Sequence, residues 1–496
     1  MPHSPPVPAD KPVVAGPAAA FVAPALIFLA GWAMGVVWYL AAGGNWWLPL
    51  FAGSGVAAFV AWRRLAWPDG WTRYLSFGAL VLLACAINRL LYIFDFAMGA
   101  AGDLDFPFYA ADPVASIIKA EIATIAGTLL TVGAWWAAGG IRHSPGLLLS
   151  TPSASLVRLL VVTYMASLAA LALMAFVPQL YALSGQLMPT MLVLGATTAF
   201  FLPLLLARKR AVRLAIVVLM GLPFLYVSLG TGMKENIILA LAPTVYLLWS
   251  QPLRRGTRVG LALAALVGVA FITSYIGYFR AEVWHADRAI DQSAAMEEYL
   301  EAVSDAGVLA TVQEGSEAFL ARNNVAPGRG WAVAIEDAEG HRPGLVFSPL
   351  LYVFVPRMLW PGKPEIRQGW EYAGLVFGDH YIAWSDSSLS AGLYPALYLG
   401  GGWTMVVLGA LGVGLAMAFF THLAFRMGGP VLVGLFSLSM LPFALRLDEA
   451  WTVGAFSAPL INFVYILVIF MAARVAAAIL GGRPDGRDGA GSSWRS

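Results

Sequence analysis

The residues best suited to chemistry in this sequence form one short run, residues 355–364, which reads VPRMLWPGKP. Two cations, Arg357 and Lys363, stand in it together with three prolines that stiffen the chain and with Trp360. A guanidinium offers a planar fork to phosphate oxygens, and an ammonium offers a point charge. The run is therefore predicted to bind a phosphate-bearing lipid headgroup. The alternative is an interfacial anchor, because tryptophan, arginine and lysine gather at membrane surfaces.

A second candidate is a pair of opposite charges within apolar stretches. Arg89 and Glu121 lie about eight or nine residues from the predicted outer ends of two consecutive stretches, or roughly 12–14 Å along a helix axis. Ionisable side chains at that depth are costly and mark functional sites. We expect the two side chains to pair, either as a structural ion pair that fixes helix packing or as the polar floor of an outward-facing cavity.

A third candidate is the turn at residues 230–236, GTGMKEN, which carries Lys234. The turn lacks the spacing of a nucleotide-binding phosphate loop. It is predicted to be a tight hairpin that presents one cation and one acid at the membrane edge, or to hold a lysine that reaches along the membrane surface.

Other chemistries are excluded by residue types and spacing. The six histidines include no pair at metal-ligand spacing, and the sequence contains neither HExxH nor GxSxG. The single cysteine, Cys85, rules out an intramolecular disulfide, a cysteine zinc cluster and an iron–sulfur site. No metal ion and no cofactor is therefore predicted.

The elements that position these residues are membrane helices. Of the 496 residues, 59% are hydrophobic and 12% are charged, whereas a soluble fold has about a quarter charged residues. Apolar runs near the roughly 20 residues that a bilayer requires occur twelve times, at 17–42, 46–62, 74–98, 114–138, 157–177, 187–207, 213–230, 236–250, 259–279, 403–424, 430–446 and 452–473. The predicted fold class is all-α: a polytopic integral membrane protein of about twelve transmembrane helices.

The basic residues set the predicted orientation. With the N-terminus in the cytoplasm, the inner loops and tails collect 18 of the 30 lysines and arginines but only four of the 28 acids. This distribution obeys the positive-inside rule. Both termini are therefore predicted to be cytoplasmic in a multi-pass protein of the cytoplasmic (inner) membrane, and the basic clusters are topology signals that require no nucleic acid.

The predicted organisation has five parts. A cytoplasmic tail (1–15) precedes nine transmembrane helices (16–279), a large outer, periplasmic loop (280–402), three further transmembrane helices (403–474) and a disordered cytoplasmic tail (475–496). The loop begins with a polar helical pattern at 288–323, in which Met296, Tyr299, Leu300, Val303 and Leu309 recur at three- and four-residue steps. Its second part, 344–402, is apolar but broken by prolines and by the glycine triplet 400–402, which predicts interfacial or re-entrant half-helices.

The run at 356–364, PRMLWPGKP, resembles the corresponding motif of the O-antigen polymerases, the Wzy-type family of oligosaccharide repeat-unit polymerases. The dozen predicted spans, the large outer loop near the C-terminus and the outer hairpin with a basic residue after glycine agree with this family. The resemblance extends from Ser348 to about Gly414, while the first 200 residues match the family only in hydropathy.

The resemblance implies a metal-independent glycosyltransferase reaction. A growing glycan passes from undecaprenyl diphosphate to the terminal hydroxyl of another lipid-linked repeat unit on the outer face of the membrane, as in O-antigen or exopolysaccharide assembly. The protein must hold two lipids, neutralise the diphosphate and deprotonate one hydroxyl. Arg357 and Arg280 are expected to bind the diphosphate, with Lys363 and Lys234 in support. The same outer loop contains the candidates for the base, which are His380, Glu371 and Asp386. Of these, His380 is favoured.

Two other functions stay open. One is a ligase that attaches a finished glycan from the same donor to an acceptor, and the other is a flippase or transporter of lipid-linked oligosaccharide. The expected partners are the undecaprenyl-diphosphate-linked oligosaccharide, membrane lipids and a chain-length regulator.

Overall fold

The structure is a computed structural model, and it is helical throughout the part of the chain that it describes. It describes residues 52–60, 113–140, 154–176, 210–230, 255–279, 292–323, 326–355, 359–378, 389–440 and 451–479, with scattered residues at 30, 77–89, 191–202 and 443–450. No strand occurs among these residues. The predicted all-α class is confirmed for this part of the chain.

Five predicted spans coincide with helices to within a few residues. These helices are α4 (Pro113–Ala137), α5 (Ala154–Phe176), α8 (Arg210–Gly230), α10 (Arg255–Phe279) and α20 (Thr452–Ile479). Three segments in the described part are long and apolar enough to cross a membrane: Ala115–Ala137, Leu393–Gly429 and Thr452–Ala476. The predicted spans at 17–42 (apart from residue 30) and 236–250 lie outside the described residues, and those at 74–98 and 187–207 are described only at scattered positions.

The helix α18 (Leu393–Ser439) consists of three pieces, 393–400, 403–428 and 430–439, joined by reversals of the chain. A Cβ added at Gly409 would overlap the side chain of Leu397, although twelve residues of straight helix would separate them by about 18 Å. Likewise, the rings of Phe420 and Phe436 lie 6.4 Å apart. Gly402 and Gly429 allow the reversals, because both have φ of 63°, a conformation that favours glycine. The predicted helix starts at 403 and 430 therefore match the structure.

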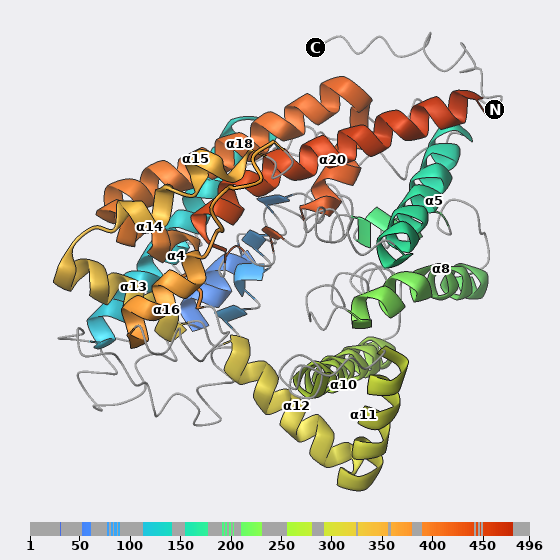
Figure 1. Cartoon of the computed structure of the whole chain (residues 1–496), viewed down its shortest axis with the longest axis horizontal. Coiled ribbons are helices and arrows are strands. Elements are labelled where there is room, and N and C mark those ends of the chain that lie inside the picture. Colours follow the sequence, from blue (N-terminus) through green and yellow to red (C-terminus); the bar gives the residue numbers. More distant parts are fainter. Residues whose placement is uncertain are drawn as a thin grey trace, which may run out of the picture.

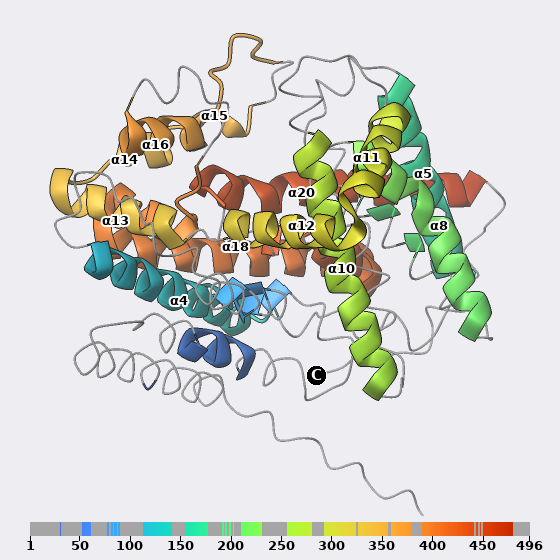
Figure 2. The same ribbon diagram turned by 90° about the horizontal axis from the view of Figure 1, so that it is seen from below.

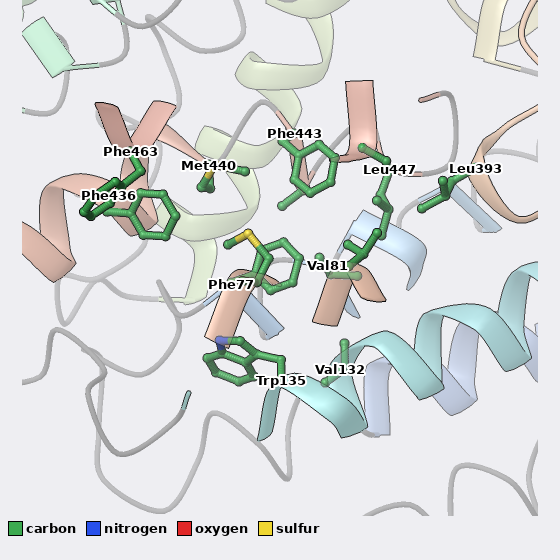
Figure 3. Close-up of a cluster of buried hydrophobic side chains, with 14 of the residues drawn as sticks. Phe77, Val81, Val132, Trp135, Leu393, Phe436, Met440, Phe443, Leu447 and Phe463 are labelled. Carbon is green, nitrogen blue, oxygen red and sulfur yellow. The ribbon is translucent and has the colours of Figure 1, made fainter. Parts of the chain in front are cut away.

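Helix α4 packs against α18, and α18 packs against α20, so that the three lie side by side (Figure 1, Figure 2). Figure 3 shows the aromatic centre of the core that they share with Phe77, Val81 and Leu82. The ring of Phe77 stacks on Phe443 at 6.0 Å and meets the edge of Trp135 at 6.3 Å. These contacts join the predicted spans at 74–98, 114–138 and 430–446 in one core.

The first part of the predicted outer loop forms two helices, α11 (Gln292–Ala306) and α12 (Val308–Asn323), which contact α10 (Figure 2). The predicted apolar stripe is only partly correct. Tyr299 and Val303 are buried against α10, but Leu300 is 53% exposed and Leu309 is 83% exposed. Gly307, with φ of 88°, ends α11, so the three- and four-residue spacing does not carry over from α11 to Leu309.

The second part of the loop folds into short helices that gather over one end of α4 and α18 (Figure 1). They are α13 (Ala326–Glu339), α14 (Pro343–Phe347), α15 (Leu350–Val353) and α16 (Gln368–Phe377). Together with residues 389–400 they form what we call the cap, which has its own buried cluster of Ala332, Ile335, Val346, Tyr372, Val376, Ala391, Ala396 and Leu399. The broken helices predicted for 344–402 thus appear as a packed layer.

Polar contacts fasten the cap to the start of α20. The indole Nε1 of Trp451 donates to the carbonyl of Leu389 at 3.2 Å, and its ring meets the ring of Tyr372 at 5.3 Å. Gln368 Nε2 donates to the hydroxyl of Thr452 at 3.4 Å, and this hydroxyl donates to the carbonyl of Val346. The first residues of α20 are therefore held against the cap.

Candidate functional site

The structure brings together the two charges that the sequence placed at equal depth. Arg89 and Glu121 are 0% and 2% exposed. The Arg89 Nε donates to Glu121 Oε1 at 2.9 Å, and its Nη2 donates to Oε2 at 3.3 Å, which is the fork geometry of a bidentate pair. The Arg89 Nη1 also reaches the carbonyl of Cys85 at 3.5 Å. The guanidinium is thus held in one orientation.

A second arginine reaches the same carboxylate. Arg329, on α13, is 1% exposed, and its Nη1 lies 3.7 Å from Glu121 Oε2. We call Arg89, Glu121 and Arg329 the arginine–glutamate cluster. Such a group is expensive to remove from water, and ionisable side chains buried between apolar helices mark functional sites.

Three elements position the cluster. Helix α4 supplies Glu121 and α13 supplies Arg329, and these two helices pack against each other. The helical segment 52–60 closes the cluster from the side of Arg89, because a Cβ added at Gly55 would lie 3.2 Å from the Arg89 Cβ. The absence of a side chain at Gly55 therefore gives the stem of Arg89 its space.

A second polar group lies further along α13, about 12 Å beyond Arg329 at 1.5 Å per residue. The carboxylate of Asp337 accepts a hydrogen bond from Lys119 Nζ at 2.6 Å and one from the hydroxyl of Tyr398 at 3.2 Å. The side chains of Lys119 and Asp337 are 43% and 36% exposed. This group links α4, α13 and α18 near the molecular surface.

Glu336, beside Asp337, contacts a histidine. The Nδ1 of His341 lies 2.9 Å from Glu336 Oε1, with the imidazole 56% exposed and the carboxylate 11% exposed. Gly340 makes this contact possible: it ends α13 with φ of 83°, and its N–H donates to the carbonyl of Glu336 at 2.8 Å. The chain therefore turns back at the glycine and sets the next side chain on the last turn of the helix.

The pKa of Glu336 is raised above its ordinary value. Burial is the largest cause, because it disfavours the charged form, and the hydrogen bond and negative charge of Asp337 add to it. The nearby His341 acts in the opposite direction. Glu336 therefore holds its proton to a higher pH than an exposed glutamate, as do many carboxyls that take part in proton transfer.

Among the predicted phosphate-binding residues, Lys363 is described. Its Nζ donates to the carbonyls of Val353 and Val355 at 3.1 and 2.9 Å, so it ties the motif run back to the end of α15. Trp360 lies against Tyr352, with ring centroids 6.4 Å apart. The end of the run is thus held against α15, and Lys363 has a structural role there.

The other predicted site residues are placed as follows. Glu371 is exposed on the first turn of α16. Arg357, Arg280, Lys234, His380 and Asp386 lie outside the described residues, so their predicted roles stay predictions.

The sequence analysis missed Arg329 and the Glu336–His341 pair. A signal for Arg329 was present, because it directly precedes the run Gly330 to Ile335, GWAVAI, of which all but Trp331 is buried. An arginine that directly precedes an apolar run on the same helix becomes buried when that run packs into the core. No comparable signal exists for Glu336 and His341, because their contact depends on the turn at Gly340.

The described part is thus a bundle of apolar helices with a buried charge cluster and a helical cap, the architecture of an integral membrane protein. Residues 148–438 match the family described as "Domain of unknown function (DUF8712)". This match covers more than half of the chain, so the chain belongs to that family. It includes Arg329, Glu336 and His341 but neither Arg89 nor Glu121. No curated protein and no solved structure matches the chain.

Proposed function

We propose that the protein is a polysaccharide polymerase of the cytoplasmic membrane. In this proposal it transfers a glycan from undecaprenyl diphosphate to the terminal hydroxyl of a second lipid-linked repeat unit. The reaction takes place on the outer face, where O-antigen or exopolysaccharide chains are assembled. The proposal includes the twelve spans and the two cytoplasmic termini predicted from the sequence.

The observation that carries the proposal is the arginine–glutamate cluster. It holds two guanidiniums against one carboxylate at less than 3% exposure, next to a cap with exposed polar groups. A diphosphate leaving group carries negative charge that grows as its bond to the sugar breaks. Fixed cations in a site that excludes water stabilise such charge more strongly than cations in solution.

The resemblance of residues 356–364 adds the second support. Lys363 and Trp360, at the end of this run, contact Val355 and Tyr352 beside the end of α15, on the same cap that contributes Arg329. Arg357 lies within the run, and we assign it to the donor diphosphate together with Arg280. Lys234 has a supporting role at the same headgroup. Lys363 acts mainly by holding the end of the run against α15.

The reaction needs no covalent intermediate on the protein. The acceptor oxygen attacks the anomeric carbon, the bond from that carbon to the diphosphate oxygen breaks, and the bonding electrons leave with the lipid diphosphate. A base removes the hydroxyl proton. Since the diphosphate is already a stable anion, the protein contributes orientation, charge stabilisation and this one proton transfer.

A second candidate function is transport of lipid-linked oligosaccharide. This function is supported by the burial of three ionisable side chains between packed helices, because intramembrane charges mark transport pathways as well as catalytic sites. It also gains weight from the chain reversal at residues 401–402, since broken helices line the binding sites of many transporters.

One experiment separates these functions: deletion of the protein followed by analysis of lipid-linked saccharides. We expect single repeat units to accumulate on undecaprenyl diphosphate at the outer face of the membrane, accessible to an added glycosidase, while long chains disappear. Accumulation of the same units inside the cell would support the transporter. Accumulation of long chains on undecaprenyl diphosphate would support a ligase. Either of these two results would contradict the polymerase.

A further inference from the structure

The most chemically distinctive group on the cap is the contact between His341 and Glu336. The Nδ1 of the imidazole faces Glu336 Oε1 at 2.9 Å, so Nδ1 is assigned the shared proton and Nε2 is left as the acceptor nitrogen. The carboxylate is largely buried and the imidazole is more than half exposed. A buried acid thus orients an exposed base, as it does in catalytic triads.

The backbone holds this arrangement from both sides. Gly340 turns the chain at the end of α13, and the N–H of Arg342 donates to the carbonyl of Leu399 at 2.8 Å. This bond fixes the residue after His341 against the piece 393–400 of α18. The imidazole is therefore positioned by two helices.

Gly402 lies beside the imidazole at the chain reversal. A Cβ added at Gly402 would lie 3.6 Å from His341 Cε1 and 3.9 Å from Glu336 Oε1. Any side chain at this position would stand next to the carbon between the two ring nitrogens. Glycine at 402, which the reversal requires for its φ of 63°, therefore also keeps a side chain away from this face of the base.

The charged surroundings suit a proton acceptor. From α13, Glu336 and Asp337 face the imidazole region. From α4, Lys119 pairs with Asp337, and from α18 the hydroxyl of Tyr398 donates to Asp337. Asp337 thus accepts from two donors. Glu336 contacts the imidazole and also interacts with Asp337 and Tyr398 through side-chain hydrogen bonds, so its carboxyl group is held in place beside the histidine.

We propose that His341 is the general base of the glycosyl transfer and that Glu336 is its positioning residue. This inference rests on the proposed function. Nε2 of His341 takes the proton of the acceptor hydroxyl while that oxygen bonds to the anomeric carbon. The diphosphate leaves with the electrons of the broken bond, and the imidazolium then returns its proton to water. His341 takes the place that the sequence analysis gave to His380.

The test uses the purified full-length protein in lipid vesicles and, as substrate, the lipid-linked repeat units that accumulate in deletion cells. His341→Gln can still donate to Glu336 but cannot accept a proton. We expect it to lower kcat about 100-fold or more, the usual contribution of a general base, with little change in KM and in the melting temperature. The matched control is His422→Gln, an exposed histidine on α18, which should keep wild-type kcat.

Glu336 is tested by the separation of kcat from KM and by rescue with the conservative variant. Glu336→Gln removes the carboxylate that faces His341 Nδ1, so kcat should fall about 10-fold with little change in KM and in the melting temperature. Glu336→Asp, which keeps a carboxylate, should recover most of the rate. A His341→Gln variant within twofold of wild type would overturn the assignment. A wild-type protein that does not lengthen the substrate would overturn the proposed function and the assignment with it.

Discussion

Replacing Glu121 with glutamine lowers the free energy of unfolding by about 3–5 kcal/mol, the cost of breaking a buried ion pair by removing one partner. The reason is the arrangement of the cluster. Glu121 is the carboxylate that Arg89 and Arg329 share, so the variant leaves two buried guanidiniums without this counter-charge. Thermal melting of the purified protein in lipid nanodiscs, together with its abundance in membranes, measures the effect.

The same helix provides a matched control. Lys119 lies two residues before Glu121 on α4, and its ion pair with Asp337 is partly exposed, at 43% and 36%. Solvent-screened pairs contribute about 0–1 kcal/mol, so Lys119→Ala should melt close to wild type. If Glu121→Gln melted at the same temperature as Lys119→Ala, the arginine–glutamate cluster would not hold α4, α13 and residue 89 together.

Arg357→Ala and Arg357→Lys both abolish most of the polymerisation without lowering the amount of protein in the membrane. A hydrogen bond to a charged group contributes roughly 1.5–3 kcal/mol, which corresponds to about 10- to 150-fold in rate for one contact. Lysine fails as well as alanine because a single ammonium cannot reproduce the planar fork of a guanidinium at a diphosphate. The rate of chain lengthening per membrane protein measures the effect.

Arg367 is the control for this prediction. It lies in the same segment, is 55% exposed, pairs with Glu365 at 2.6 Å and stacks over Trp370 at 5.2 Å. Arg367→Ala should retain the wild-type rate. If Arg357→Ala also retained it, residues 356–364 would be a membrane anchor, and the resemblance to the polymerases would carry no function.

The sequence predicted most of the helices because each apolar run is close to the length of one bilayer crossing. This holds for α4, α5, α8, α10 and α20, and the glycine triplet 400–402 indicated the first break within α18. The positions of Arg89 and Glu121 within their predicted spans also predicted the contact between them. Both residues lie at the same depth on consecutive antiparallel helices, where a charged side chain is costly unless an opposite charge pairs with it.

The cap could not be predicted in the same way. Its helices are short, and they are held by contacts between residues far apart in the chain, such as Trp451 with Leu389. Arg329 becomes part of the cluster only because α13 packs on α4. The contact of His341 with Glu336 depends on one backbone angle at Gly340. Such contacts follow from tertiary packing and leave no periodic pattern in the sequence.

Chain lengthening with purified components is the most direct test of whether the protein is a polymerase. The full-length protein is placed in vesicles with lipid-linked repeat units, without nucleotide, metal ion or ion gradient, and the lengths of the lipid-linked saccharides are measured over time. We expect products that grow by whole repeat units, with one undecaprenyl diphosphate released for each new linkage. Repeat units that cross the bilayer without growing in length would contradict the proposed polymerase.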